Sequence, residues 1–121
     1  MHKFENLEVW KLAIEYVDLC YAIADKLPDS ERFNLSSQLK RASTSVALNI
    51  AEGSTSQTNP EQARFVSIAI RSVVETVACQ KLIERRKYLS EHSVLEKTYQ
   101  ASEKLVAKLQ AFRASIIRKV G

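Results

Sequence analysis

The chain has 121 residues, of which 45% are apolar and 26% charged, close to the averages for soluble globular proteins and far from those of disordered chains. This length suits a single domain, 1–121, that buries roughly two thirds of its unfolded surface, so a core needs neither a metal nor a disulfide. The formal net charge is +4, and only two glycines and two prolines occur, which leaves too few turn residues for an all-β protein.

Apolar residues at steps of three and four predict a first helix from about Asn6 to Lys26. A turn over 27–30 follows, because Pro28 disfavours helix in the residue before it. Asp29 or Ser30 can then cap a second helix from about Glu31 to Glu52. We expect this helix to end at Gly53, where a left-handed residue after the last turn costs least.

A third helix is expected from about Pro60 to Lys87, with Asn59 as its N-cap and Gln62 three residues later, as in a capping box. Its apolar residues form two adjacent stripes, which predicts burial on two sides, either centrally in a bundle or against another subunit. The stripes are Phe65/Ile68/Cys79/Ile83 and Val66/Ile70/Val73/Val77.

A fourth helix is expected from about Glu91 to Lys119, capped by Ser90 or Ser93. No proline or glycine separates it from the third helix, so a single helix bent near Tyr88 is the alternative. Four helices with short connections predict an all-α domain folded as an antiparallel up-and-down four-helix bundle.

The two cysteines, Cys20 and Cys79, lie in apolar periodic segments without the spacing of a disulfide framework or a zinc site, which predicts buried, reduced thiols. Four carboxylates among the first twenty residues are incompatible with the uncharged core of a secretion signal. No apolar run approaches the ~20 residues that cross a bilayer. We therefore expect a cytoplasmic protein without membrane contact.

Catalytic and metal-binding patterns are missing from the sequence. The only histidines are His2 and His92, and neither follows a glutamate by three residues as in carboxylate-bridged di-iron bundles. Glu52 and Glu75 lie close to apolar stripes, but without a histidine or a glycine-rich phosphate loop a buried polar contact is their more ordinary role. We expect no catalytic residue, metal, cofactor or small-molecule substrate, and hence a non-enzymatic protein.

The second helix carries polar residues at steps of three and four, beside its apolar stripe. The small residues Ala42, Ser45 and Ala47 nearby indicate close helix approach, which favours packing or a subunit interface over a solvated face. With one stripe of the third helix, the candidate packing or interface residues are Gln38, Arg41, Ser45, Asn49, Glu52, Val66, Ile70, Val73 and Val77.

Charge is distributed unevenly along the chain. Residues 1–80 hold 8 Lys and Arg against 10 Asp and Glu, whereas residues 81–121 hold 10 against 4, so the balance changes from −2 to +6. A basic helix surface can follow a phosphate backbone, although a merely solvated lysine-rich face is the alternative. No base-recognition motif accompanies it, so binding would read shape or charge. The candidate nucleic-acid-binding residues are Arg85, Arg86, Lys87, Lys97, Lys104, Lys108, Arg118 and Lys119.

Several segments resemble one bacterial family. They are the opening Phe4–Ala13, the turn at Leu27–Pro28 with Glu31, Phe33 and Leu35, the stretch Gln38–Gly53 with its Asn-Ile-Ala-Glu-Gly end, and the later Phe65, Ile68–Ala69, Ser72 and Glu75. The sequence is similar here to the four-helix-bundle proteins encoded in intervening sequences of 23S ribosomal RNA genes.

The resemblance implies a small cytosolic bundle that assembles as a ring-shaped homopentamer, in a family whose molecular function is largely undetermined. The chain is also similar to the accessory protein of diversity-generating retroelements, a basic pentameric barrel that binds a reverse transcriptase and nucleic acid. Arg71 departs from the family, which typically has a small residue before the serine, so the resemblance does not settle the subunit contacts near Ser72.

Together these features predict an oligomeric binding or assembly protein that contacts RNA or an RNA-associated protein through a basic surface. The alternative is a purely structural or protein-interaction module whose lysines only maintain solubility.

Overall fold

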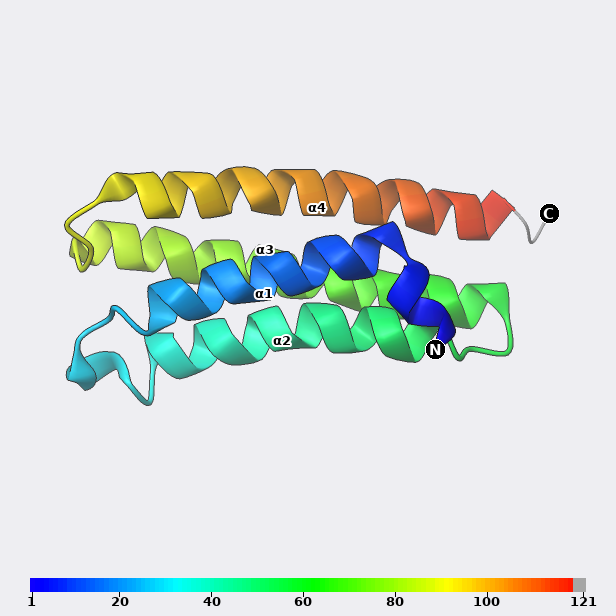
Figure 1. Cartoon of the computed structure of the whole chain (residues 1–121), viewed down its shortest axis with the longest axis horizontal. Coiled ribbons are helices and arrows are strands. Elements are labelled where there is room, and N and C mark those ends of the chain that lie inside the picture. The colour runs from blue at the N-terminus through cyan, green and yellow to red at the C-terminus, as the bar shows by residue number, and fades with distance from the viewer. Residues whose placement is uncertain (119–121) are drawn as a thin grey trace.

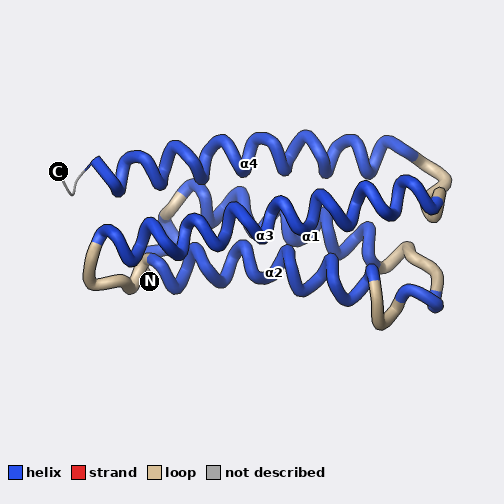
Figure 2. The backbone as a smooth tube through the Cα atoms, turned by 180° about the vertical axis from the view of Figure 1, so that it is seen from behind, coloured by secondary structure: helices blue, strands red, loops and turns tan. Residues whose placement is uncertain are grey.

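The computed structural model describes residues 1–118, which form helices and short connections (Figures 1 and 2). The long helices are α1 (Glu8–Ala24), α2 (Leu35–Gly53), α3 (Asn59–Arg86) and α4 (His92–Arg118). Two short 3-10 helices, η1 (Lys3–Asn6) and η2 (Asp29–Glu31), precede α1 and α2. No strand occurs among these residues, which confirms the predicted all-α class.

The four long helices lie side by side with their long axes roughly aligned (Figure 1). The α1–α2 and α3–α4 connections lie at one end, which we call the η2 end, and the α2–α3 connection lies at the other end. Each helix packs against the helices before and after it in the chain, and α4 also packs against α1. The helices therefore surround a single core.

The core consists of one apolar face from each helix, as expected for amphipathic helices with a period of 3.6 residues. Its residues with at most 1% exposure include Ile23 from α1, Leu39 and Val46 from α2, Val73 and Ile83 from α3, and Leu105 and Leu109 from α4. Cys20 and Cys79 are free thiols buried in the same cluster, which confirms their predicted burial.

The wide apolar arc of α3 is accommodated within one protomer. Val66 and Val73 are buried, whereas Ile70 and Val77 are half-buried. Because α3 packs against both α2 and α4, its burial on two sides needs no second subunit. Contact of α3 with another subunit stays a prediction.

Two helix starts differ from the prediction. α2 begins at Leu35 rather than near Glu31, because Asp29–Glu31 form a separate 3-10 turn and Asn34 adopts a non-helical conformation with φ −126° and ψ −102°. The N-cap of α3 is Thr58 rather than Asn59, since the Thr58 hydroxyl accepts the Glu61 N–H at 3.3 Å. Both residues have cap-forming side chains, so local sequence did not discriminate between them.

Two helix ends correct the prediction as well. Gly53 is the last residue of α2 and has no positive φ, so the predicted left-handed residue is wrong. Lys87 takes that conformation after α3 instead, with φ 56° and ψ 39°. Because a left-handed residue terminates a helix, α3 and α4 are separate helices. The alternative of a single helix bent near Tyr88 is therefore wrong.

Candidate functional site

The predicted basic residues lie on two segments of the chain. Arg85, Arg86 and Lys87 are exposed at the end of α3, where the α3–α4 connection begins. Lys97, Lys104, Lys108 and Arg118 are exposed along α4, which leads away from that end. Lys119 lies outside the described residues.

The lysines of α4 run beside α1. Lys108 Nζ lies 3.1 Å from Glu8 Oε1, and Lys104 shares the same face of α4 because it is four residues away. A carboxylate this close partly neutralises the Lys108 ammonium. The row therefore attracts phosphate less strongly than its number of lysines suggests.

The middle of the polar stripe of α2 contacts α3. Ser45 Oγ lies 2.9 Å from Ser72 Oγ, and the Asn49 amide donates to the Ser45 carbonyl at 2.8 Å. These residues are half-buried or buried, so the middle of the stripe packs within the protomer. The remaining members of the stripe, Gln38, Arg41 and Glu52, are exposed.

Glu52 and Glu75 are both exposed, so the buried polar contact predicted for them is wrong. Each carboxylate lies on the solvent side of its helix. Neither has the environment of a catalytic acid.

Large apolar side chains remain uncovered on the outer sides of α2 and α3. Leu48, Val74 and Leu82 are 53%, 58% and 51% exposed. Val74, Ala78 and Leu82 follow one another at four-residue steps and form one stripe along α3. We refer to Val74, Ala78 and Leu82 as the outer α3 face, whereas Leu48 lines a hollow between α1 and α2 together with Tyr21 and Thr44.

A buried hydrogen-bond network, which sequence reasoning missed, crosses the core from α1 to α3. Gln80 Nε2 donates to the Tyr16 hydroxyl at 2.8 Å, and the Tyr16 and Thr76 hydroxyls lie 2.7 Å apart. Burial raises the pKa of the Tyr16 phenol well above its usual value and raises that of the neighbouring Cys20 thiol to about 12. These groups are neutral at physiological pH, and Cys20 is a poor nucleophile.

A second unpredicted contact joins the two connections at the η2 end. The Tyr88 hydroxyl donates to Glu31 Oε2 at 2.6 Å, and Asn34 Nδ2 donates to Glu31 Oε1 at 2.9 Å. The hydrogen bond from Tyr88 is the main cause that holds the pKa of Glu31 below its usual value, and it raises the pKa of Tyr88. This contact ties the turn before α2 to the loop after α3.

The Glu31–Tyr88 contact predicts a pH dependence of stability. Since the pKa of Glu31 is lowered by folding, its contribution is complete above the pKa of the unfolded chain and disappears as the pH falls through the folded value. The unfolding free energy of the wild type should exceed that of Tyr88→Phe at neutral pH, and the difference should shrink as the pH falls below the ordinary pKa of a glutamate. Urea unfolding at several pH values measures this difference. A difference that is constant with pH would contradict the assignment.

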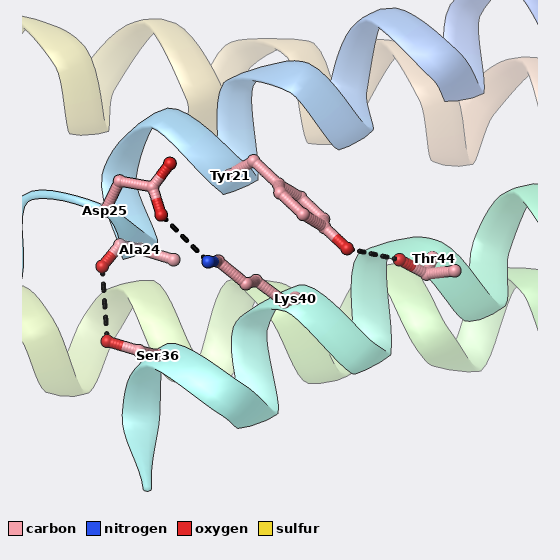
Figure 3. Close-up of polar contacts among 6 residues, drawn as sticks. All are labelled: Tyr21, Ala24, Asp25, Ser36, Lys40 and Thr44. Atoms are coloured by element: carbon pink, nitrogen blue, oxygen red, sulfur yellow. Dashed lines mark hydrogen bonds and ion pairs between the residues drawn. The ribbon is translucent and has the colours of Figure 1, made fainter. Parts of the chain in front are cut away.

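A shallow groove runs between α1 and α2 from the η2 end. Figure 3 shows the contacts that close the seam beneath it: Lys40 Nζ lies 2.8 Å from Asp25 Oδ1, and the Tyr21 and Thr44 hydroxyls lie 3.2 Å apart. The groove consists of two adjoining hollows of about 460 and 480 Å³ that share Lys40 and Arg41. The first hollow also includes Arg32 and Phe33, and we call the whole the α1–α2 groove.

Within residues 1–118, no group of three or more His, Cys, Asp or Glu residues is arranged to hold a metal ion. Among the same residues, no helix combines the length and the apolar character that crossing a membrane requires.

Residues 5–111 match the family model described as 23S rRNA-intervening sequence protein. The match includes α1, α2 and α3 and most of α4. No curated protein matches the chain.

Proposed function

Because the chain belongs to the 23S rRNA-intervening sequence protein family, we propose that it is a non-enzymatic, oligomeric binding protein of the cytoplasm. Its protomer is an antiparallel up-and-down four-helix bundle, and five copies form a ring. The ring contacts RNA or an RNA-associated protein through a basic surface. This role is like that of the accessory protein of diversity-generating retroelements, which the sequence resembles.

The observation that carries assembly is the outer α3 face. Val74 and Leu82 are both more than half exposed, and with Ala78 between them they form an apolar stripe that a partner would remove from water. The exposed charges of the same helix are of both signs, with Arg71 four residues before Glu75 and Lys81 three residues before Glu84. A surface of mixed sign suits a second copy of the chain better than a polyanion.

The assembly is tested with Leu82→Glu. An added carboxylate in an apolar interface has no partner and must be desolvated, so we expect the variant to be a monomer at micromolar concentration while the wild type is an oligomer. Light scattering coupled to size exclusion measures the mass, and native mass spectrometry counts the subunits.

Ile117→Glu is the matched control, because Ile117 is 42% exposed on α4 and lies outside the outer α3 face. It should leave the oligomer intact. A wild-type monomer at this concentration would contradict the assembly, and a stable ring of another number would contradict the pentamer.

The basic C-terminal third supports the RNA contact, since residues 81–121 carry a formal charge of +6. Titration of RNA at increasing salt should show affinity that falls steeply, as expected when cations on the protein displace counterions. Absence of binding at low salt would contradict this half of the proposal. The ion pair of Lys108 with Glu8 favours the alternative, a protein-interaction module without nucleic acid, which predicts protein that purifies free of nucleic-acid absorbance.

A further inference from the structure

A second apolar surface lies on the side of the bundle formed by α1 and α2. Ile14, Tyr21 and Leu48 are 40%, 38% and 53% exposed. Ile14 and Tyr21 share one face of α1 because they are seven residues apart, and Tyr21 lines the same hollow as Leu48 of α2. Phe33, which is 88% exposed, lines the adjoining hollow and extends the apolar surface toward the η2 end. We call Ile14, Tyr21 and Leu48 the α1–α2 face.

Polar groups next to the α1–α2 face already have partners within the protomer. The Tyr21 and Thr44 hydroxyls lie 3.2 Å apart, and Lys40 is paired with Asp25 (Figure 3). A partner that covers this face therefore gains apolar contact without having to supply a hydrogen bond to these groups. The α1–α2 groove as a whole is lined by three cations and three carboxylates, so a protein surface suits it better than a ligand of one sign.

The α1–α2 face and the outer α3 face lie on different sides of the molecule. α1 and α3 each pack against α2 and α4, so they occupy opposite corners of the bundle. A protomer can therefore hold one neighbour on each face. When two different faces of a chain bind each other, the contact is heterologous, and a heterologous contact produces a ring if the rotation between copies closes.

The two faces belong to segments of opposite net charge. Residues 8–53, which comprise α1, α2 and the turn between them, hold 7 Asp and Glu against 5 Lys and Arg, a balance of −2. Residues 59–86, which form α3, hold 3 against 5, a balance of +2. Opposite charges favour contact between the two segments and disfavour contact of either segment with its own copy.

Contact between two outer α3 faces would bring cations together. Arg71, Ala78 and Arg85 recur at seven-residue steps and so share one face of α3. In an antiparallel pair of α3 helices centred on Ala78, Arg71 of each copy would lie beside Arg85 of the other, and in a parallel pair each arginine would lie beside its equivalent. Both arginines are exposed, and neither forms an ion pair among the residues that the structure describes. The outer α3 face therefore suits a different surface of the second copy.

We propose that the α1–α2 face of one copy packs against the outer α3 face of the next copy, and that this contact, repeated around an axis, builds the ring. The inference rests on the proposed function, because it requires assembly, and it adds the second surface of the interface. Leu48 of one copy and Leu82 of the next, each more than half exposed in the protomer, are covered in the same contact.

The test mixes two variants that each lose one face. Leu48→Glu places a carboxylate on the α1–α2 face and Leu82→Glu places one on the outer α3 face, so each variant alone should be a monomer. Their mixture should contain a dimer with one copy of each, because the intact outer α3 face of the first variant meets the intact α1–α2 face of the second. The two remaining faces of this dimer are disabled, so it cannot grow.

Light scattering coupled to size exclusion measures the mass of each sample. Native mass spectrometry, with one variant isotopically labelled, counts the copies of each variant in the dimer. The mixture is measured at the highest soluble concentration, because a single contact lacks the added stability that closure of a ring provides.

Ile14→Glu is the matched control, since Ile14 lies on the same face as Leu48. It should form a dimer with Leu82→Glu but not with Leu48→Glu, because those two variants lack the same face. Ile117→Glu, on α4 and outside both faces, should remain an oligomer. All four side chains are at least 40% exposed, and circular dichroism checks that each variant is folded.

Two results would overturn the inference while the proposed assembly stands. The first is an oligomer of wild-type mass in Leu48→Glu, which would show that the outer α3 face meets another surface. The second is a mixture of Leu48→Glu and Leu82→Glu that remains monomeric at a concentration where the wild type is an oligomer. A wild type that is itself a monomer would overturn the inference and the proposed assembly together.

Discussion

Gly53→Val is expected to lower the free energy of unfolding by about 3 kcal/mol. Gly53 ends α2 where it approaches α3, and a Cβ placed on it would lie 2.9 Å from Phe65 Cβ. The opposing atom is the first of its side chain, so no rotamer change relieves the overlap, and the helices must separate.

Gly53→Ala should destabilise less, by about 1 kcal/mol, because alanine's higher helix propensity offsets part of the clash. Urea denaturation followed by circular dichroism measures both variants. Ala107→Val, which adds two methyl groups to alanine at an exposed position of α4, is the control and should destabilise the protein by less than about 1 kcal/mol, through the lower helix propensity of valine. A Gly53→Val protein as stable as this control would show that the two helices separate without cost.

Tyr16→Phe is expected to cost about 2 kcal/mol of unfolding free energy, because it leaves the buried head group of Gln80 unpaired. Each group of the network donates to the next one, from Gln80 through Tyr16 and Thr76 to the Val73 carbonyl. Thr76 donates its own hydrogen to the Val73 carbonyl, so Tyr16 donates to Thr76 and accepts from Gln80. The Gln80 carbonyl oxygen has no partner among the described residues, and its amide has only Tyr16.

A double-mutant cycle separates this loss from the loss of the hydroxyl itself. Tyr16→Phe with Gln80→Leu removes both the donor and the group left unpaired, and should therefore be more stable than Tyr16→Phe alone. Tyr99→Phe deletes a hydroxyl at an exposed site and should have almost no effect. Additive costs in the cycle would contradict the coupling of Tyr16 and Gln80.

The four long helices followed from residue patterns, and so did the burial of Cys20 and Cys79. Helix ends were less predictable, because several residues in a row satisfy the same local rule. Thr58 and Asn59 can both cap α3, and a left-handed residue was expected at Gly53 but occurs at Lys87. Which residue ends a helix depends on the packing of the next helix, and a local pattern does not contain that information.

The candidate site was less accessible from sequence than the fold. Counting charges identified the basic C-terminal third of the chain. It did not reveal that Lys108 of α4 pairs with Glu8 of α1, because that contact joins residues far apart in the sequence. The exposed ring of Phe33 was missed because that residue was included in a continuous second helix. Its exposure follows from the separate η2 turn, which the periodicity of apolar residues does not predict.

By itself, the sequence determined the number of helices and most of the residues that face the core, because helix periodicity depends only on neighbours three and four positions apart. The tertiary structure alone decided the contacts between residues 57 to 64 positions apart, such as Glu31 with Tyr88 and Tyr16 with Gln80. It also decided which side chains remain uncovered. Those outcomes depend on how four similar helices pack against one another, and that packing minimises the free energy of the whole chain rather than of any segment.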